Sequence, residues 1–132
     1  MLPLLLAATL LAAGPACPDP GLANPHLKVV RADVRGFDDY IVTVEVGNRG
    51  TAPQTAGIVQ HLDLLQNGKL LGTQPIPALG PGQTYISAFR LRLPHERKRK
   101  PLAAEFRYVL ADAGRAGREN CNTANDALSA TL

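Results

Sequence analysis

Two cysteines lie near opposite ends of the sequence, and they are the residues most able to form a covalent bond. Cys17 precedes a proline-rich stretch, and Cys121 lies within the polar segment ENCNTAND, residues 119–126. An oxidised pair is expected in an exported protein, and closing a loop of ~100 residues contributes about 4 to 5 kcal/mol in the chain-entropy treatment. We therefore predict a disulfide between Cys17 and Cys121. Two alternatives stay open: a lipidated Cys17 beside a free Cys121, and pairing between two molecules.

Candidate catalytic residues are few. His61 and Asp63 share one face of an expected strand, but a triad also needs a nucleophile within reach of the base. Ser87 is expected to face inward, and Ser129 lies in the expected last strand. We therefore predict no catalytic residues, no cofactor and no enzymatic activity, with a small hydrolase that uses His61 as the remaining alternative.

Candidate metal ligands are equally sparse. Neither the two cysteines nor the three histidines have the spacing of a zinc site. Asp38 and Asp39 are adjacent on an expected strand, so their side chains point to opposite faces. Calcium requires six to eight oxygen ligands. We predict no metal site, although four side chains near the end of the chain could approach a cation: Asp112, Glu119, Asn122 and Asp126.

The densest run of charge lies between residues 90 and 107. Seven basic residues there outnumber two acidic ones, which leaves +5 in this stretch and −2 in the rest of a chain whose net charge is +3. Basic side chains clustered in this way attract anions. We predict that six of them contact an anion or a partner: Arg90, Arg92, Arg97, Lys98, Arg99 and Lys100. A second candidate contact loop is the segment 112–119 with its arginines.

The anion has several possible sources in an exported protein: a surface polysaccharide, a lipid head group or extracellular nucleic acid. The chain has no Trp, three Tyr and three Phe, so few aromatic side chains are free to stack on bases. Sequence-specific nucleic-acid binding is therefore disfavoured, whereas a general electrostatic contact would weaken steeply with added salt.

The elements that must position these residues are strands. Polar and apolar residues alternate with period two in residues 40–47 and 84–93, which is typical of half-buried strands. Further strands are expected from Leu27, over residues 58–66 and 69–73, and at 104–110 and 127–132. Asn67-Gly68 predicts a tight hairpin, and Pro75 excludes a central position in a sheet. About seven short strands predict an all-β, immunoglobulin-like antiparallel sandwich.

The N-terminal region has a different composition. Residues 1–16, MLPLLLAATLLAAGPA, carry no charged side chain and are too short to span a bilayer. Their small-x-small ending predicts a signal peptide cleaved after Ala16. Residues 17–26 are then expected to form a proline-rich leader, and residues 27–132 the folded domain. Because cleavage would leave Cys17 first, a lipoprotein acylated at Cys17 is the alternative.

Three segments resemble those of one known family: VTVEVGNRGTA at 42–52, LLQNGKLLGTQPIPALGPG at 64–82 and ENCNTAND at 119–126. In order and spacing they are similar to CARDB, the cell adhesion related domain found in bacteria. The resemblance covers residues 27–132 and implies a seven-stranded immunoglobulin-like sandwich with an adhesive or spacer role on a bacterial protein. Cys121, Asn122 and Ala124 depart from the family's closing motif.

Together these features predict an exported, periplasmic or extracellular module that binds and does not catalyse. Its expected partner is a protein or an anionic surface polymer. Contact with a membrane is expected only if Cys17 is lipidated, in which case the chain would be an envelope-anchored accessory subunit.

Overall fold

The computed structural model describes residues 16–132. The predicted signal peptide therefore lies outside the described residues except for Ala16, and it stays a prediction. Within residues 16–132, no helix is long and apolar enough to cross a membrane.

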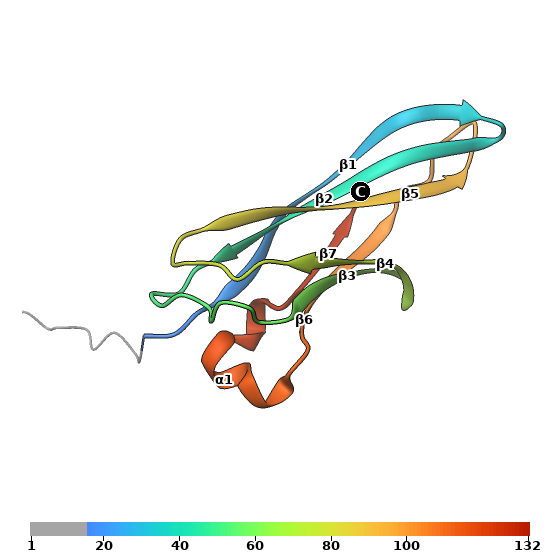
Figure 1. Cartoon of the computed structure of the whole chain (residues 1–132). Helices are drawn as coiled ribbons and strands as arrows, with labels where there is room; N and C mark the ends of the chain where they lie inside the picture. The colour runs from blue at the N-terminus through green and yellow to red at the C-terminus, as the bar shows by residue number, and fades with distance from the viewer. Residues whose placement is uncertain (1–15) are drawn as a thin grey trace, which may run out of the picture.

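Two antiparallel sheets face each other across one core (Figure 1). The first sheet has the order β1-β2-β5 and contains β1 (Pro20–Val34), β2 (Phe37–Asn48) and β5 (Thr84–Pro94). The second has the order β4-β3-β6-β7 and contains β3 (Gln60–Gln66), β4 (Lys69–Ile76), β6 (Ala103–Leu110) and β7 (Ala127–Thr131). The predicted all-β, immunoglobulin-like sandwich is confirmed. Between β6 and β7 lie three short helical turns: η1 (Ala113–Arg115), α1 (Ala116–Glu119) and η2 (Thr123–Asn125).

Strand β1 begins earlier than the expected Leu27. It starts at Pro20 and pairs with β2 from Pro20↔Asn48 onward, so most of the expected leader belongs to the sandwich. Two properties of β1 accommodate its prolines. Pro20 is the first residue of an edge strand, and Pro25 lies in the register shift between Ala23 and His26, both places where a missing N–H interrupts no ladder hydrogen bond.

The core follows the predicted alternation. In β2 the inward residues Tyr40, Val42, Val44 and Val46 are all buried. Leu62 and Leu64 of β3 face them from the other sheet and are fully buried. Of the inward set expected in β5, Ser87, Phe89 and Leu91 are buried, whereas Tyr85 at the strand's start remains 37% exposed. Pro75 lies in β4, an edge strand, as its missing donor requires.

One end of the sandwich, which we call the closed end, is held together by the side chain of Asn48. Its amide nitrogen donates to the carbonyls of Ala52 (2.9 Å) and Leu79 (3.0 Å), while its amide oxygen accepts from the backbone N–H groups of Asp19 and Gly50. This asparagine opens the Asn-Arg-Gly-Thr-Ala segment. It thus satisfies backbone groups of three loops that meet where the strands end.

The disulfide joins Cys17 to Cys121 at this closed end. The N–H of Cys121 also donates to the carbonyl of Pro18 at 3.0 Å, and the side-chain amide of Asn125 donates to Asp19 at 2.8 Å. Gly50 is required here, because a β-carbon at this position would collide with the backbone of Cys17. The predicted disulfide between Cys17 and Cys121 of the same molecule is confirmed.

A second buried polar cluster lies beneath the same end. The side-chain amides of Gln54 and Gln60 bond to each other reciprocally at 2.8 and 2.9 Å, and the hydroxyl of Tyr108 donates to the oxygen of Gln60. Glu119, which is 1% exposed, accepts from the N–H of Thr55 at 2.8 Å. Burial is the main cause that raises the pKa of Tyr108 to about 12, so its hydroxyl remains a donor at neutral pH.

We expect removal of the disulfide to lower stability strongly. The Cys17→Ser/Cys121→Ser protein should lose about 2 to 5 kcal/mol of unfolding free energy, because the unfolded chain regains the freedom of a loop spanning 104 residues. Urea unfolding of both proteins measures this. Equal midpoints for the two proteins would contradict it.

The Tyr108→Phe substitution should cost about 1 to 2 kcal/mol, since it removes two buried hydrogen bonds, one donated to Gln60 and one accepted from Gln54, while both amides keep other partners. Tyr85→Phe is the matched control, because Tyr85 is 37% exposed, and it should change stability by no more than ~0.5 kcal/mol. Thermal unfolding followed by circular dichroism compares them. An equal loss in both variants would mean that the buried cluster contributes nothing specific.

Candidate functional site

The predicted anion-binding residues lie at the end of the sandwich opposite the disulfide, which we call the basic end. Three connections lie at this end: the β1–β2 turn at residues 35–36, the β3–β4 turn at 67–68 and the β5–β6 loop at 95–102. In Figure 1 the sheet formed by β1, β2 and β5 extends beyond the second sheet at this end. The β1–β2 hairpin therefore projects from the body of the domain.

Arg90 and Arg92 lie on the outward face of β5. Arg92 forms an ion pair with Asp39 of the neighbouring strand, in which Nε donates to Oδ1 at 2.7 Å and Nη2 donates to Oδ2 at 3.2 Å. The hydrogen bond from Arg92 is the main cause that lowers the pKa of Asp39. Within residues 16–132, Arg90 forms no ion pair, so it is the cation on this strand that is available to a ligand.

The other four predicted residues, Arg97 to Lys100, lie in the β5–β6 loop and are exposed. Lys100 is 4.0 Å from Glu96, and Arg99 donates to the carbonyl of Leu132 at 3.1 Å. No ion pair of Arg97 or Lys98 occurs in the described part of the chain. The structure thus divides the predicted set between the β5 face and the loop.

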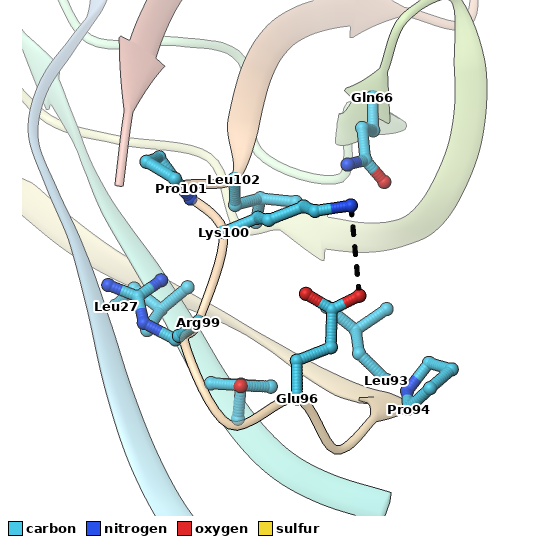
Figure 2. Close-up of a pocket in the computed structure, with 10 residues that line it drawn as sticks. Leu27, Gln66, Leu93, Pro94, Glu96, Arg99, Lys100, Pro101 and Leu102 are labelled. Carbon is cyan, nitrogen blue, oxygen red and sulfur yellow. Dashed lines mark ion pairs between the residues drawn. The ribbon is translucent and has the colours of Figure 1, made fainter.

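Each group borders a hollow. The first measures about 190 Å³ and lies at the mouth of the core, where Figure 2 shows Lys100 and Glu96 reaching toward each other across it. Its lining is apolar below and charged at the rim: Leu27, Tyr40, Gln66, Leu93, Pro94, Glu96, Arg99, Lys100, Pro101 and Leu102. The second measures about 470 Å³ and lies on the outer face of the projecting sheet, where Val30, Arg31, Asp39, Ile41, Arg90 and Arg92 contribute to its lining.

A carboxylate that is only 6% exposed ties the basic loop to the hairpin. Asp38 accepts from the N–H of Asp33 at 2.7 Å and from the hydroxyl of Tyr40 at 3.0 Å, and it lies 2.8 Å from Nδ1 of His95. The N–H of His95 also donates to the carbonyl of Gly36 at 2.9 Å. The first residue of the loop is therefore bonded to the turn at Gly36 and to β2 at Asp38, and Asp38 in turn bonds to β1 at Asp33.

These contacts shift both partners' pKa values in the directions that favour an ion pair. The N–H of Asp33, followed by His95, lowers the pKa of Asp38. The hydrogen bond with Asp38 raises the pKa of His95, and this exceeds the opposing effect of desolvation. The expectation that Asp38 and Asp39 face opposite ways is confirmed, because Asp38 points inward to Tyr40 and Asp39 outward to Arg92.

The residues considered for catalysis lie apart. His61 and Asp63 are 3.4 Å apart on the outer face of β3, and Asp63 also accepts from the hydroxyl of Thr73. Ser87 is buried on the inner face of the other sheet, so the core separates it from His61. Ser129 pairs with Glu105 and His61 with Val109, which places the two about 13 Å apart along β6 at 3.3 Å per residue.

The four side chains considered for a cation do not converge. Glu119 bonds to Thr55, and Asp126 accepts both bonds from the amide of Asn120. Asp112 accepts from the N–H of Gly114, and Asn122 from that of Ala124. Among residues 16–132 no group of three or more His, Cys, Asp or Glu side chains could hold a metal ion.

Two features of the basic end were missed from the sequence. The bond between His95 and Asp38 joins residues 57 positions apart, and no local pattern indicates such a contact. The projecting hairpin exposes Val29, Val30, Val34 and Phe37. The adjacent Val29 and Val30 could have revealed it, because two successive apolar residues break the alternation of a strand with one buried face.

Two solved structures have the same overall fold as this chain. A CARDB domain from Pyrococcus furiosus, solved in complex with di-metal ions, superposes with a TM-score of 0.55 at 17% identity, over 89% of this chain and 93% of that one. The fold is that of a CARDB domain. A domain of a Methanosarcina acetivorans protein described as a cell surface protein superposes with a TM-score of 0.56 at 18% identity, over 88% of this chain and 90% of that one. No protein-family model matches the sequence, and no curated protein matches it.

The Asp38–His95 pair predicts a pH-dependent contribution to stability. His95 has a raised pKa when folded, so its contribution is complete below about 6.5, the usual value, and is lost as the pH rises through the folded value. Asp38 has a lowered pKa, so its contribution is present above about 3.9 and is lost as the pH falls through its folded value. The stability advantage over the His95→Gln protein should therefore be greatest between about pH 4 and 6.5 and shrink at higher pH.

Urea unfolding of both proteins from pH 4 to 9 measures this difference. NMR titration of His95 in the Asp38→Asn protein is the complementary control, and the pKa of His95 should fall when the carboxylate is neutralised. An advantage that is constant across the whole pH range would contradict the prediction.

Proposed function

We propose that this chain is an exported binding module without catalytic activity, whose basic end contacts an anionic polymer of the cell envelope or an acidic protein. The contact residues would be those predicted from the sequence: Arg90, Arg92, Arg97, Lys98, Arg99 and Lys100. One observation carries the proposal, namely that these cations lie at the end of a rigid sandwich opposite its disulfide. Loops presented by a rigid scaffold are the usual site of recognition.

The electrostatics support an anionic partner. Residues 90–100 contain six basic side chains and one acidic one, Glu96, which is a net charge of +5. Arg92 is neutralised by Asp39, but Arg90, Arg97 and Lys98 have no carboxylate partner within residues 16–132. Free cations of this kind bind a polyanion by displacing the counterions that are condensed on it.

The disulfide and the fold favour an exported location. A disulfide is expected in an oxidising compartment, and the two solved domains compared above have descriptions that point to the cell surface or to CARDB. The sulfur of Cys17 is bonded to Cys121, so in this state it cannot carry a lipid thioether. The acylated alternative therefore requires a reduced Cys121, which the intact mass before and after reduction would reveal.

Neutralising the free loop cations should weaken binding to an anionic polymer. With heparin as the probe, the Arg97→Gln/Lys98→Gln protein should bind on the order of tenfold more weakly, and its affinity should depend less steeply on salt because fewer counterions are released. Affinity measured at several salt concentrations gives both quantities.

A matched control is available at the closed end. The Arg115→Gln/Arg118→Gln protein loses the same charge from an exposed segment that lies between β6 and β7. It should bind heparin like the unmodified protein. Equal weakening in both double variants would show that net charge, and not the basic end, determines binding, and the proposal would then be wrong.

A further inference from the structure

The projecting β1–β2 hairpin exposes an unusual set of side chains. Among the described residues, eight large hydrophobic side chains are exposed, and half of them belong to this hairpin: Val29 (44%), Val30 (48%), Val34 (38%) and Phe37 (42%). Such clustering differs from the scattered exposure that is normal for a soluble surface.

These apolar side chains lie on both faces of the hairpin. Val29 is opposite Tyr40 in the register, so it is on the face that points toward the second sheet, yet it is 44% exposed. Phe37 shares the opposite face with Asp39, two residues further along β2. A partner protein laid flat against one face would leave the other face uncovered.

Cations surround the apolar tip. Arg31 and Arg90 border the outer hollow beside Val30, and Arg35 occupies the turn itself with φ 55°. The loop that carries Arg97 to Lys100 begins at His95, whose N–H is bonded to the turn at Gly36. Residues 28–41 are neutral, with three basic and three acidic side chains, so the +5 of residues 90–100 determines the charge of the whole end.

We propose that the hairpin inserts its apolar tip into the head-group region of an anionic lipid bilayer, while the surrounding cations contact lipid phosphates. A head-group layer can surround a projecting turn and cover both its faces at once. Apolar side chains bury in the interfacial zone while basic ones add attraction to anionic lipids. This inference rests on the proposed anion-binding function and names one source of the anion. It also differs from the sequence-based expectation, because membrane contact here needs no lipid on Cys17.

The first experiment is co-sedimentation of the oxidised protein with phosphatidylcholine vesicles that contain about 30% of the anionic lipid phosphatidylglycerol, because anionic lipids attract basic segments near the surface. The Val34→Ser/Phe37→Ser protein should bind these vesicles about tenfold more weakly, because it loses apolar area to bury, but should bind heparin unchanged. The matched control is Val59→Ser/Ile86→Ser, which removes two exposed apolar side chains (70% and 58% exposed) away from the hairpin. It should leave vesicle binding intact. Thermal unfolding checks that each variant is folded.

A fluorescence measurement reports insertion directly. The chain has no Trp, so Phe37→Trp introduces a single reporter at the tip. Its emission should shift to shorter wavelength with the anionic vesicles and not with pure phosphatidylcholine, whereas an Ile86→Trp reporter should not shift.

The outcomes separate the two proposals. Heparin binding without vesicle binding, or vesicle binding that the Val34→Ser/Phe37→Ser change leaves intact, would overturn the membrane inference and leave the anion-binding function standing, with an acidic protein or a polymer as the partner. If the unmodified protein bound neither heparin nor the anionic vesicles, both the anion-binding proposal and the membrane inference would be wrong.

Discussion

Phe89 and Phe106 belong to different sheets and meet in the core, where their ring centroids are 6.3 Å apart. Both side chains are almost fully buried, as are the valines of β2 and the leucines of β3 that surround them. Because side chains alternate along a strand, burying these residues places their neighbours on the outer faces. The positions of Asp39, Arg90 and Arg92 on the surface are thus a consequence of the core, and a register shift of one residue would turn those charges inward.

The two ends of the sandwich have different physical roles. At the closed end, the side-chain amides of Asn48 and Gln54 satisfy backbone groups of several loops and the disulfide joins two segments covalently. Hydrogen-bonded polar clusters of this kind make a region rigid. At the basic end, the hairpin and the β5–β6 loop are exposed, and many of their side chains have no partner among residues 16–132. The disulfide and the Asn48 bonds therefore lie at the end opposite the exposed cations that we propose for binding, so those cations can vary without disturbing these contacts.

Much of this arrangement could be predicted from the sequence, because strands, hairpins and turns are determined locally. The period-two alternation identified β2 and β5, and Asn67-Gly68 identified a turn whose residues have φ of 50° and 78°. The Arg35-Gly36 turn has the same positive φ at both residues, 55° and 84°, but arginine is not a residue that signals it. The start of β1 was placed too late because prolines normally disfavour strands, and the edge position that tolerates them is a property of the assembled sheet.

The site was harder to predict because its geometry depends on contacts between distant residues. The sequence identified the basic residues of the β5–β6 loop, but not that Asp38 and His95 attach this loop to the hairpin. The attachment matters chemically, since it holds a loop of like charges beside an apolar turn that would otherwise be independent of it. Each bond is modest, but together they limit how far the loop can swing away. In the binding that we propose, cations and apolar side chains would therefore reach the partner as one unit, which would reduce the ordering cost of binding.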